Sequence, residues 1–280
     1  MIRLVETIKD VRSFVEAVRK RGETIGFVPT MGAFHLGHLS LMRQAKKETD
    51  AVVVSIFVNP LQFAAGEDYD RYPRQMAKDL RMAESERVEV LLAPSVAEMY
   101  PKGFATYIDQ NDLPTKLCGE FRPDHFRGVM SVVAKLFNIV KPDVAFFGQK
   151  DFQQYLLIRR MATDLNLDVD VRVLPTVREE DGLAMSSRNI YLGPKQRKDA
   201  ICLYRALQRA EELIGSGESG AVKVASEMKR VILRVKGARI DYIAVVNSDT
   251  LEPVKEIKGK TLIAAAVRIG KARLIDNILI

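Results

Sequence analysis

The sequence predicts an α/β protein: a Rossmann-like, doubly wound parallel sheet followed by a smaller C-terminal α+β domain. Three observations support this fold class. Short apolar runs rich in Val, Ile and Phe recur before Pro175, amphipathic stretches separate them, and the pattern changes after that proline. Strands buried on both faces are nearly continuous in apolar residues, and their alternation with helices is typical of βαβ units.

The expected elements follow one another in a regular order. We expect strands at 24–28, 51–58, 88–93, 143–148 and 169–175. The apolar periodicity between them predicts helices at about 37–48, 74–86, 127–141 and 151–165. After the loop-like TVREEDGLAMSSRN, it predicts two long helices, at about 195–214 and 219–235, and then strands in IDYIAVVN, TLIAAAVRIG and ARLIDNILI. We therefore place the domains at residues 1–175 and 176–280.

Composition narrows the function classes. The chain has 280 residues, with 43 Lys and Arg against 36 Asp and Glu, a formal charge of +7. The cations are spread along the chain and form no single basic block, so we predict no nucleic-acid partner. A nucleotide or another small anion fits the positive charge equally well. No apolar stretch reaches the roughly 18 residues of a membrane span, so we expect a cytoplasmic protein without a membrane partner. Cys118 and Cys202 are isolated, which predicts reduced thiols and no zinc site.

The segment PTMGAFHLGH, residues 29–38, contains two of the three histidines. It joins the carboxyl end of an expected strand to the start of a helix, where open α/β sheets bind ligands. A helix N-terminus offers free N–H groups to phosphate, and Gly37 removes a side chain that would hold phosphate away. His35 and His38 can donate hydrogen bonds to phosphate and stabilise charge on a leaving group. The alternative is a pair of surface or capping histidines in a turn.

A second segment, AMSSRN at 184–189, strengthens the functional interpretation. Two hydroxyls and an arginine in one loop can surround a polyphosphate. Taken alone, the segment is more typical of a polar turn with an N-cap. Together, HLGH and MSSRN resemble the HxGH and KMSKS signatures of nucleotidyltransferases, a superfamily that includes the class I aminoacyl-tRNA synthetases.

A closer resemblance follows from five segments in order: PTMGAFHLGHLSLM, VSIFVNPLQF, LCGEFRPDHFRGV, FFGQKDFQQ and MSSRNIYL. They are similar to the pantothenate synthetase family, the ligases that join pantoate to β-alanine, from about residue 25 to residue 193. The sequence departs from the family pattern at Gln149, where Glu is more frequent, and at Asp124, where Gly is usual. These departures put in doubt any role assigned to those two side chains.

The resemblance implies an ATP- and Mg²⁺-dependent reaction. Pantoate attacks the α-phosphate, pyrophosphate leaves, and β-alanine displaces AMP from pantoyl adenylate. The first domain then binds nucleotide and pantoate, the second acts as a lid, and the enzyme is a homodimer. No covalent nucleophile is needed, which agrees with the absence of a Ser-His or Cys-His arrangement in the sequence. The protein's tasks are positioning and charge stabilisation.

The resemblance also implies roles for individual residues. His38 is the proton donor, His35 assists at the phosphates, and Lys150 and Arg188 hold the phosphates. The ATP-binding residues are Met31, Gly32, Ala33, Phe34, His35, Leu36, Gly37, His38, Gly148, Gln149, Lys150, Asp151, Val177, Met185, Ser186, Ser187 and Arg188. The substrate-binding residues are Gln62 and Gln154, with Asn59 and His125 as further candidates. No metal ligand is assigned, since we expect Asp79 to be a surface carboxylate of a helix and not a magnesium ligand.

Some of these residues also have structural interpretations. Gln62 and Gln154 could be surface amides, and Lys150 with Asp151 could mark the start of a helix. Uncharged amides nevertheless suit pantoate, because a cation at its carboxylate would stabilise the nucleophile in the ground state.

Two other functions stay open. A related nucleotidyltransferase would leave the nucleotide on its product and release no AMP. A catalytically idle nucleotide- or RNA-binding module would bind with an affinity that falls steeply with salt.

Overall fold

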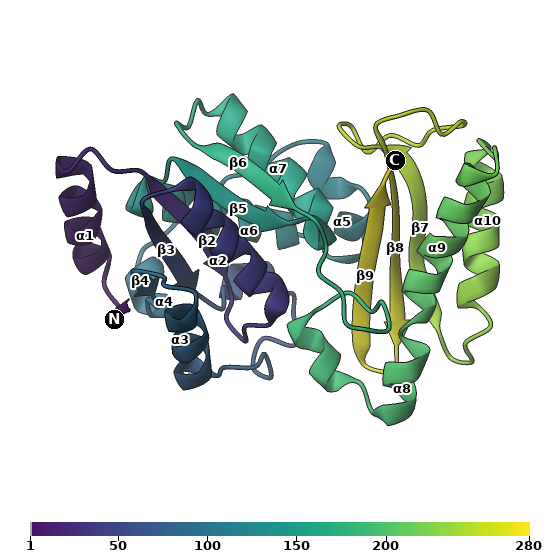
Figure 1. The fold of residues 1–280 in the computed structure, drawn as a ribbon, viewed down its shortest axis with the longest axis horizontal. Helices are drawn as coiled ribbons and strands as arrows, with labels where there is room; N and C mark the ends of the chain where they lie inside the picture. The colour runs from purple at the N-terminus through teal and green to yellow at the C-terminus, as the bar shows by residue number, and fades with distance from the viewer. Residues whose placement is uncertain (1) are drawn as a thin grey trace. The chain divides into compact units, whose positions relative to one another are not determined.

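The computed structural model describes residues 2–280, which form two compact units (Figure 1). The first unit contains the residues up to Pro114, with Arg122–Gln149 and Gln153–Pro175. The second contains Thr176–Ile280 and two short segments from the earlier sequence, Thr115–Phe121 and Lys150–Phe152. The sequence did not lead us to expect these two segments in the second unit. No helix among residues 2–280 is both long and apolar enough to cross a membrane.

The first unit is built on a six-stranded parallel sheet in the order β1-β4-β3-β2-β5-β6. The strands are β1 (Arg3–Val5), β2 (Ile25–Thr30), β3 (Ala51–Ile56), β4 (Val90–Leu92), β5 (Val144–Gly148) and β6 (Asp170–Leu174). The order reverses between β2 and β5, which confirms the doubly wound prediction. β2 pairs with β3 as far as Thr30 but with β5 only at Gly26 and Phe27, so β2 and β5 separate at their carboxyl ends.

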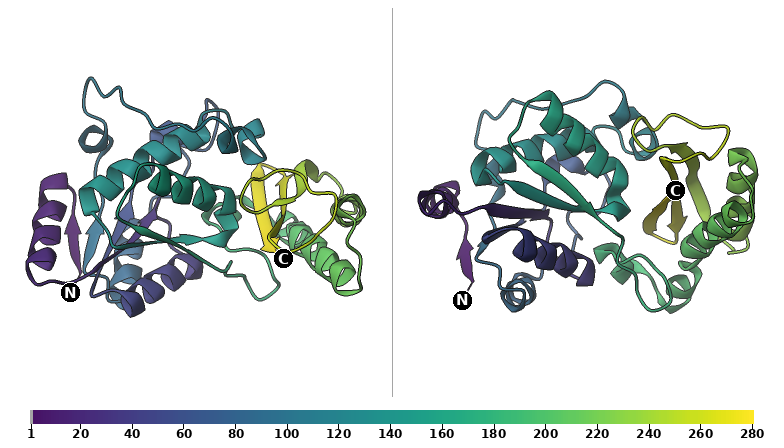
Figure 2. Two further views of the ribbon diagram at one scale, coloured as in Figure 1. Left: turned by 90° about the horizontal axis from the view of Figure 1, so that it is seen from above. Right: turned by 45° about the horizontal axis from the view of Figure 1, so that its top comes forward.

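Helices cover both faces of this sheet. They are α1 (Ile8–Lys20), α2 (Leu36–Glu48), α3 (Met76–Ser85), α4 (Val96–Met99), α6 (His125–Val140) and α7 (Phe152–Asp164). One core joins Met42 of α2 and Ala83 of α3 to Val54 of the sheet. Figure 2 shows α2 on the face opposite the teal helices α6 and α7, as right-handed crossovers on either side of the reversal require.

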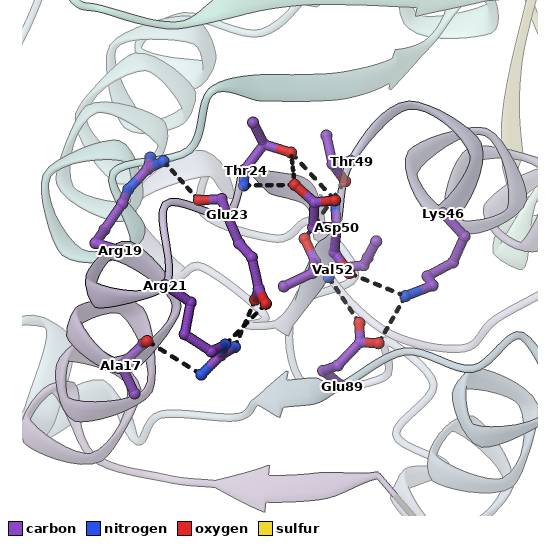
Figure 3. Close-up of polar contacts among 11 residues, drawn as sticks. Ala17, Arg19, Arg21, Glu23, Thr24, Lys46, Thr49, Asp50, Val52 and Glu89 are labelled. Atoms are coloured by element: carbon purple, nitrogen blue, oxygen red, sulfur yellow. Dashed lines mark hydrogen bonds and ion pairs between the residues drawn. The ribbon is translucent and has the colours of Figure 1, made fainter.

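Carboxylates accept hydrogen bonds at the N-terminal ends of strands β2 and β3 (Figure 3). Asp50 accepts hydrogen bonds from Thr24 N at 2.8 Å and Thr24 Oγ1 at 2.7 Å. Glu89 accepts from Val52 N at 2.7 Å and pairs with Lys46 at 2.6 Å. The backbone and side-chain hydrogen bonds from Thr24 hold the pKa of Asp50 below its ordinary value. These carboxylates therefore satisfy backbone N–H groups where β2 and β3 begin.

The second unit is an antiparallel sheet covered by helices. The strands β7 (Arg239–Asn247), β8 (Thr261–Ile269) and β9 (Ala272–Leu279) lie in chain order, and α8 (Pro194–Asp199), α9 (Cys202–Gly215) and α10 (Ala221–Ile232) precede them. The segment 115–121 adds α5 (Cys118–Phe121). This confirms the α+β expectation, but the single helix predicted over 195–214 is wrong. The helix stops after Asp199, and α9 begins at Cys202 with a tighter first turn, in which Leu203 N bonds only three residues back, to Ala200 O.

Candidate active site

The histidine segment lies at the point where the sheet reverses its strand order. β2 ends at Thr30, residues 31–35 form a loop, and α2 begins at Leu36. The partner on the other side of the reversal, β5, ends at Gly148. In open α/β sheets, ligands bind outside the carboxyl ends of the strands at this switch point. The loop before α2 and the end of β5 are therefore the places where this unit would hold a ligand.

His35 and His38 cap the helix that they begin. His35 is the N-cap residue, and its Nδ1 accepts from Gly37 N at 3.2 Å. His38 returns the interaction, since its Nδ1 accepts from His35 N at 3.3 Å. The ring centroids are 4.1 Å apart. Because both Nδ1 atoms accept, each neutral ring carries its proton on Nε2. The capping alternative is thus correct as geometry, and it places the two Nε2–H groups at the positive end of α2.

A buried carboxylate fixes the loop in front of these histidines. Asp79 of α3 is 1% exposed, and its two oxygens accept from Ala33 N and Phe34 N, each at 2.8 Å. Gly32 and Ala33 have φ of +84° and +53°, a conformation that side chains disfavour. A Cβ at Gly32 would lie 2.9 Å from Ile56 and 3.1 Å from Asp79 Oδ2. Burial raises the pKa of Asp79, and the two backbone hydrogen bonds oppose that rise. The expectation of a surface carboxylate is wrong.

Gln62 is oriented by a hydrogen-bonded chain of buried groups. Its Oε1 accepts from Asn59 Nδ2 at 3.1 Å, and its Nε2 lies 3.1 Å from the sulfur of Met31, in the histidine segment. Asn59 is 1% exposed. Its Nδ2 also donates to Gly128 O, and its Oδ1 accepts from Tyr100 Oη at 2.8 Å. The contacts leave Gln62 with an N–H to offer a ligand, whereas the Asn59 amide is used inside the protein.

His125 is held in a second polar cluster beside Gln62. Its Nδ1 lies 2.8 Å from Gln62 O, and its Nε2 lies 2.9 Å from Arg122 Nη1. Since Arg122 can only donate, His125 donates from Nδ1. Arg122 also forms an ion pair with Glu67 at 2.6 Å. Burial raises the pKa of Glu67, but the hydrogen bonds and positive charge around it, chiefly those of Arg122, together bring the pKa below its ordinary value.

The remaining predicted phosphate-binding residues, Lys150, Ser186, Ser187 and Arg188, belong to the second unit. Lys150 lies in a 3₁₀ turn, Gln149–Asp151, and its Nζ is 3.1 Å from Asp151 Oδ2. Ser186 caps the 3₁₀ turn Ser187–Tyr191 by accepting from Arg188 N at 3.3 Å. Met185 N donates to Val177 O across a hairpin, and the Ser186–Arg188 segment directly follows the second arm of that hairpin. Lys150, Ser186, Ser187 and Arg188 are all partly exposed, as phosphate-binding groups must be.

A family model described as pantoate-beta-alanine ligase matches residues 3–279. The chain belongs to this ligase family. A pantothenate synthetase of Thermotoga neapolitana is 53% identical over 99% of both chains, and one of Heliobacterium modesticaldum is 55% identical over 100% of this chain and 99% of the other. The crystal structure of pantothenate synthetase from Thermus thermophilus has a TM-score of 0.95, with 46% identity and 99% coverage of both chains.

A further solved structure is that of a ligase in complex with ligands. It is pantoate-beta-alanine ligase from Francisella tularensis complexed with beta-gamma ATP and β-alanine, which is 35% identical to this chain. Its TM-score is 0.82, and the match covers 100% of this chain and 98% of that one. The family assignment makes this protein an enzyme that joins pantoate to β-alanine.

Three residues of the ligase that support the candidate site were not found by sequence reasoning: Asp79 as a loop anchor, Tyr100 and Arg122. Their partners lie 46, 41 and 3 residues away in the chain. Only Arg122 carries a local signal, since it lies in the quoted RPDHF segment. Asp124 of that segment has φ of +61°, which explains why a glycine is usual there and why Asp, which tolerates this conformation, can replace it. Gln154, on α7, is partly exposed.

Proposed function

We propose that this ligase works in two steps through pantoyl adenylate. In the first step a carboxylate oxygen of pantoate attacks the α-phosphorus of ATP, the bond to the β-phosphate oxygen breaks, and pyrophosphate leaves. In the second step the amine of β-alanine attacks the acyl carbon, the acyl–phosphate bond breaks, and AMP leaves while the nitrogen loses a proton. The first step is required because a free carboxylate is a poor acyl donor.

The observation that supports this proposal best is the mutual capping of His35 and His38. Both Nδ1 atoms accept hydrogen bonds from the backbone, so the proton of each neutral ring lies on Nε2 at a helix N-terminus. Donors fixed before the reaction stabilise charge that develops on phosphate oxygens without further reorganisation. We assign His38 the donation to the departing pyrophosphate and His35 a contact with the phosphates.

Lys150 and Arg188 bind phosphates in this proposal. A compact ammonium suits a point contact, whereas a guanidinium gives a forked set of donors. Ser186 and Ser187 add hydroxyl or backbone contacts to the phosphates. Gly148 and Asp151 contact the ribose and Val177 lies by the adenine, as the family resemblance implies.

Gln62 and Gln154 bind pantoate in this proposal. The hydrogen bond from Asn59 fixes Oε1 of Gln62 as an acceptor and places the Nε2 donor beside Met31. We assign Nε2 of Gln62 a hydrogen bond to an oxygen of pantoate. An uncharged donor holds the carboxylate without making it a weaker nucleophile. We assign Asn59 and His125 to positioning Gln62, because their polar atoms are occupied by protein groups.

Magnesium fits here as an ion carried by ATP. Among residues 2–280 no three His, Cys, Asp or Glu side chains gather into a metal site, and both oxygens of Asp79 already accept backbone hydrogen bonds. Mg²⁺ commonly keeps its waters and binds substrate phosphates. When bound, it neutralises phosphate charge. The homodimer and the cytoplasmic location stay predictions.

The test is ATP–pyrophosphate isotope exchange without amine, using pantoate and a panel of other small hydroxy acids. The proposal requires exchange with pantoate alone and AMP release only after β-alanine is added. Exchange that needs β-alanine would refute the adenylate. Pyrophosphate release without AMP after amine addition would instead indicate transfer of the nucleotide to the product.

A further inference from the structure

Strand β9 places two consecutive polar side chains inside the second unit. Asp276 and Asn277 are 3% and 4% exposed. Consecutive strand residues point to opposite faces of a sheet. Leu274 and Ile278 of β9 pack with the apolar core beneath α9 and α10, so Asp276 lies on that face and Asn277 on the other. A buried carboxylate is costly unless it is paired, so the partners of these residues are informative.

Asp276 is paired with the base of the hairpin that leads to Arg188. Its two oxygens accept from Arg178 Nη1 at 2.5 Å and Nη2 at 3.1 Å. Arg178 also donates to Gly182 O at 3.2 Å and stacks 4.6 Å over the Tyr204 ring. Gly182 has φ of +94°, and a Cβ there would lie 1.9 Å from that ring. One guanidinium thus joins the strand, the hairpin turn and α9.

The hairpin transmits this anchoring to the Ser186–Arg188 segment. Arg178 bridges to Ala184 across the hairpin. Asn189, which follows Arg188, donates to Glu179 Oε1 at 2.9 Å and to Ala184 O at 3.2 Å. The segment that contains Arg188 is therefore tied at both ends to the hairpin that Asp276 anchors.

Asn277 contacts the other motif. Its Nδ2 donates to the backbone oxygen of Lys150 at 3.0 Å. Lys150 precedes α7 by two residues and belongs, with Asp151, to a segment assigned to the second unit. Neighbouring residues of one strand therefore support the segments of both predicted phosphate-binding cations.

We propose that Asp276 and Asn277 are positioning residues that fix Arg188 and Lys150 relative to each other before ATP binds. This inference rests on the proposed phosphate-binding role of those two cations. A phosphate group held by two preset cations needs no rearrangement of the loops, and small errors in such placement are costly to the rate.

Kinetic variants test the inference. Asp276→Asn keeps the size of the side chain but removes its charge, and should lower kcat/KM for ATP roughly tenfold or more, with KM for β-alanine unchanged. Asn277→Ala removes one hydrogen bond and should lower kcat/KM for ATP about fivefold. Arg178→Gln should lower kcat/KM for ATP as much as Asp276→Asn does. The double variant should lower it little further than either single variant, since both substitutions remove the same ion pair.

Asp241→Asn is the matched control. Asp241 belongs to β7 in the same sheet. Its side chain is 8% exposed, and Arg268 and Arg273 are its ion-pair partners. It should lower the unfolding temperature and leave the ATP constants as in the wild type. Equal kinetic effects in Asp241→Asn and Asp276→Asn would reduce Asp276 to a structural role and overturn the inference.

Lys150→Ala and Arg188→Ala separate this inference from the proposed function. If both weaken ATP use while folded Asp276→Asn and Asn277→Ala behave as wild type, only the positioning inference fails. If neither affects ATP use, the phosphate-binding role fails and the inference falls with it. Should Asp276→Asn not fold, Asn277→Ala, on the opposite face of the sheet, decides the matter.

Discussion

Replacing His38 separates its capping role from its chemical role. Its Nδ1 accepts from His35 N at 3.3 Å, and its Nε2 carries the proposed catalytic proton. Asn can place an oxygen near the position of Nδ1 but has nothing at Nε2, whereas Gln reaches the Nε2 position. Loss of a helix cap costs about 1 kcal/mol. Loss of a positioned proton donor or phosphate contact lowers the rate by roughly 10²-fold, or about 2.7 kcal/mol of activation energy.

The two magnitudes give different outcomes for three variants. His38→Ala should lose both roles, with pyrophosphate exchange down by roughly 10² or more and unfolding at lower denaturant. His38→Asn should unfold near the wild-type midpoint but exchange as slowly as His38→Ala. His38→Gln should recover part of the exchange. Near-wild-type exchange by His38→Asn would refute the reasoning, because the histidine would then act only as a cap.

Four further predictions concern single side chains. Asp79→Ala leaves two buried N–H groups without acceptors, so urea unfolding should show a loss of about 3 kcal/mol, and an unchanged midpoint would contradict the anchoring role. The pKa of Asp50 is lower in the folded state than its ordinary value, so the stability that its carboxylate contributes is present at neutral pH and is lost as pH falls through the folded-state pKa. The difference in urea midpoint between the wild type and Asp50→Asn should therefore disappear in acid. Asp124→Gly removes a side chain from a residue with positive φ, which relieves backbone strain of about 1 kcal/mol. The greater entropy of glycine in the unfolded state offsets part of this gain, so the urea midpoint of Asp124→Gly should not fall, whereas that of Asp124→Ala should. Gln62→Glu keeps the acceptor for Asn59 but removes the donor, so KM for pantoate should rise roughly tenfold or more while KM for ATP stays constant.

The parallel sheet was predictable because its strands are short, apolar and separated by helical periodicity. The same reasoning did not find β1 or α1. β1 has three residues, of which only Val5 is buried, and it is fixed by pairing with β4, far along the chain. α1 does carry a local signal, with Val11, Val15 and Val18 on its buried face. Short edge strands are thus decided by tertiary pairing, which no local pattern encodes.

The candidate site was predictable as motifs but not as geometry. HLGH and MSSRN are contiguous, so the sequence displays them directly. That both histidines use Nδ1 to cap α2 follows from the start of the helix at Leu36. The orientation of Asn59 toward Gln62, by contrast, involves a hydrogen bond from Tyr100, which lies on a separate segment. The motif identifies which residues take part, and the fold decides which atoms remain available to a ligand.

The two motifs are stabilised by the same physical device. Asp79 receives two backbone N–H groups of the loop that leads to His35, and Asp276 receives two nitrogens of the guanidinium that holds the hairpin leading to Arg188. Neither carboxylate is more than 3% exposed, so its desolvation cost is offset only while both donors stay in place. A loop that shifts therefore leaves a buried charge short of donors. That penalty disfavours displaced conformations of each loop, and it would hold each set of proposed phosphate-binding groups in place within its own unit before substrate arrives.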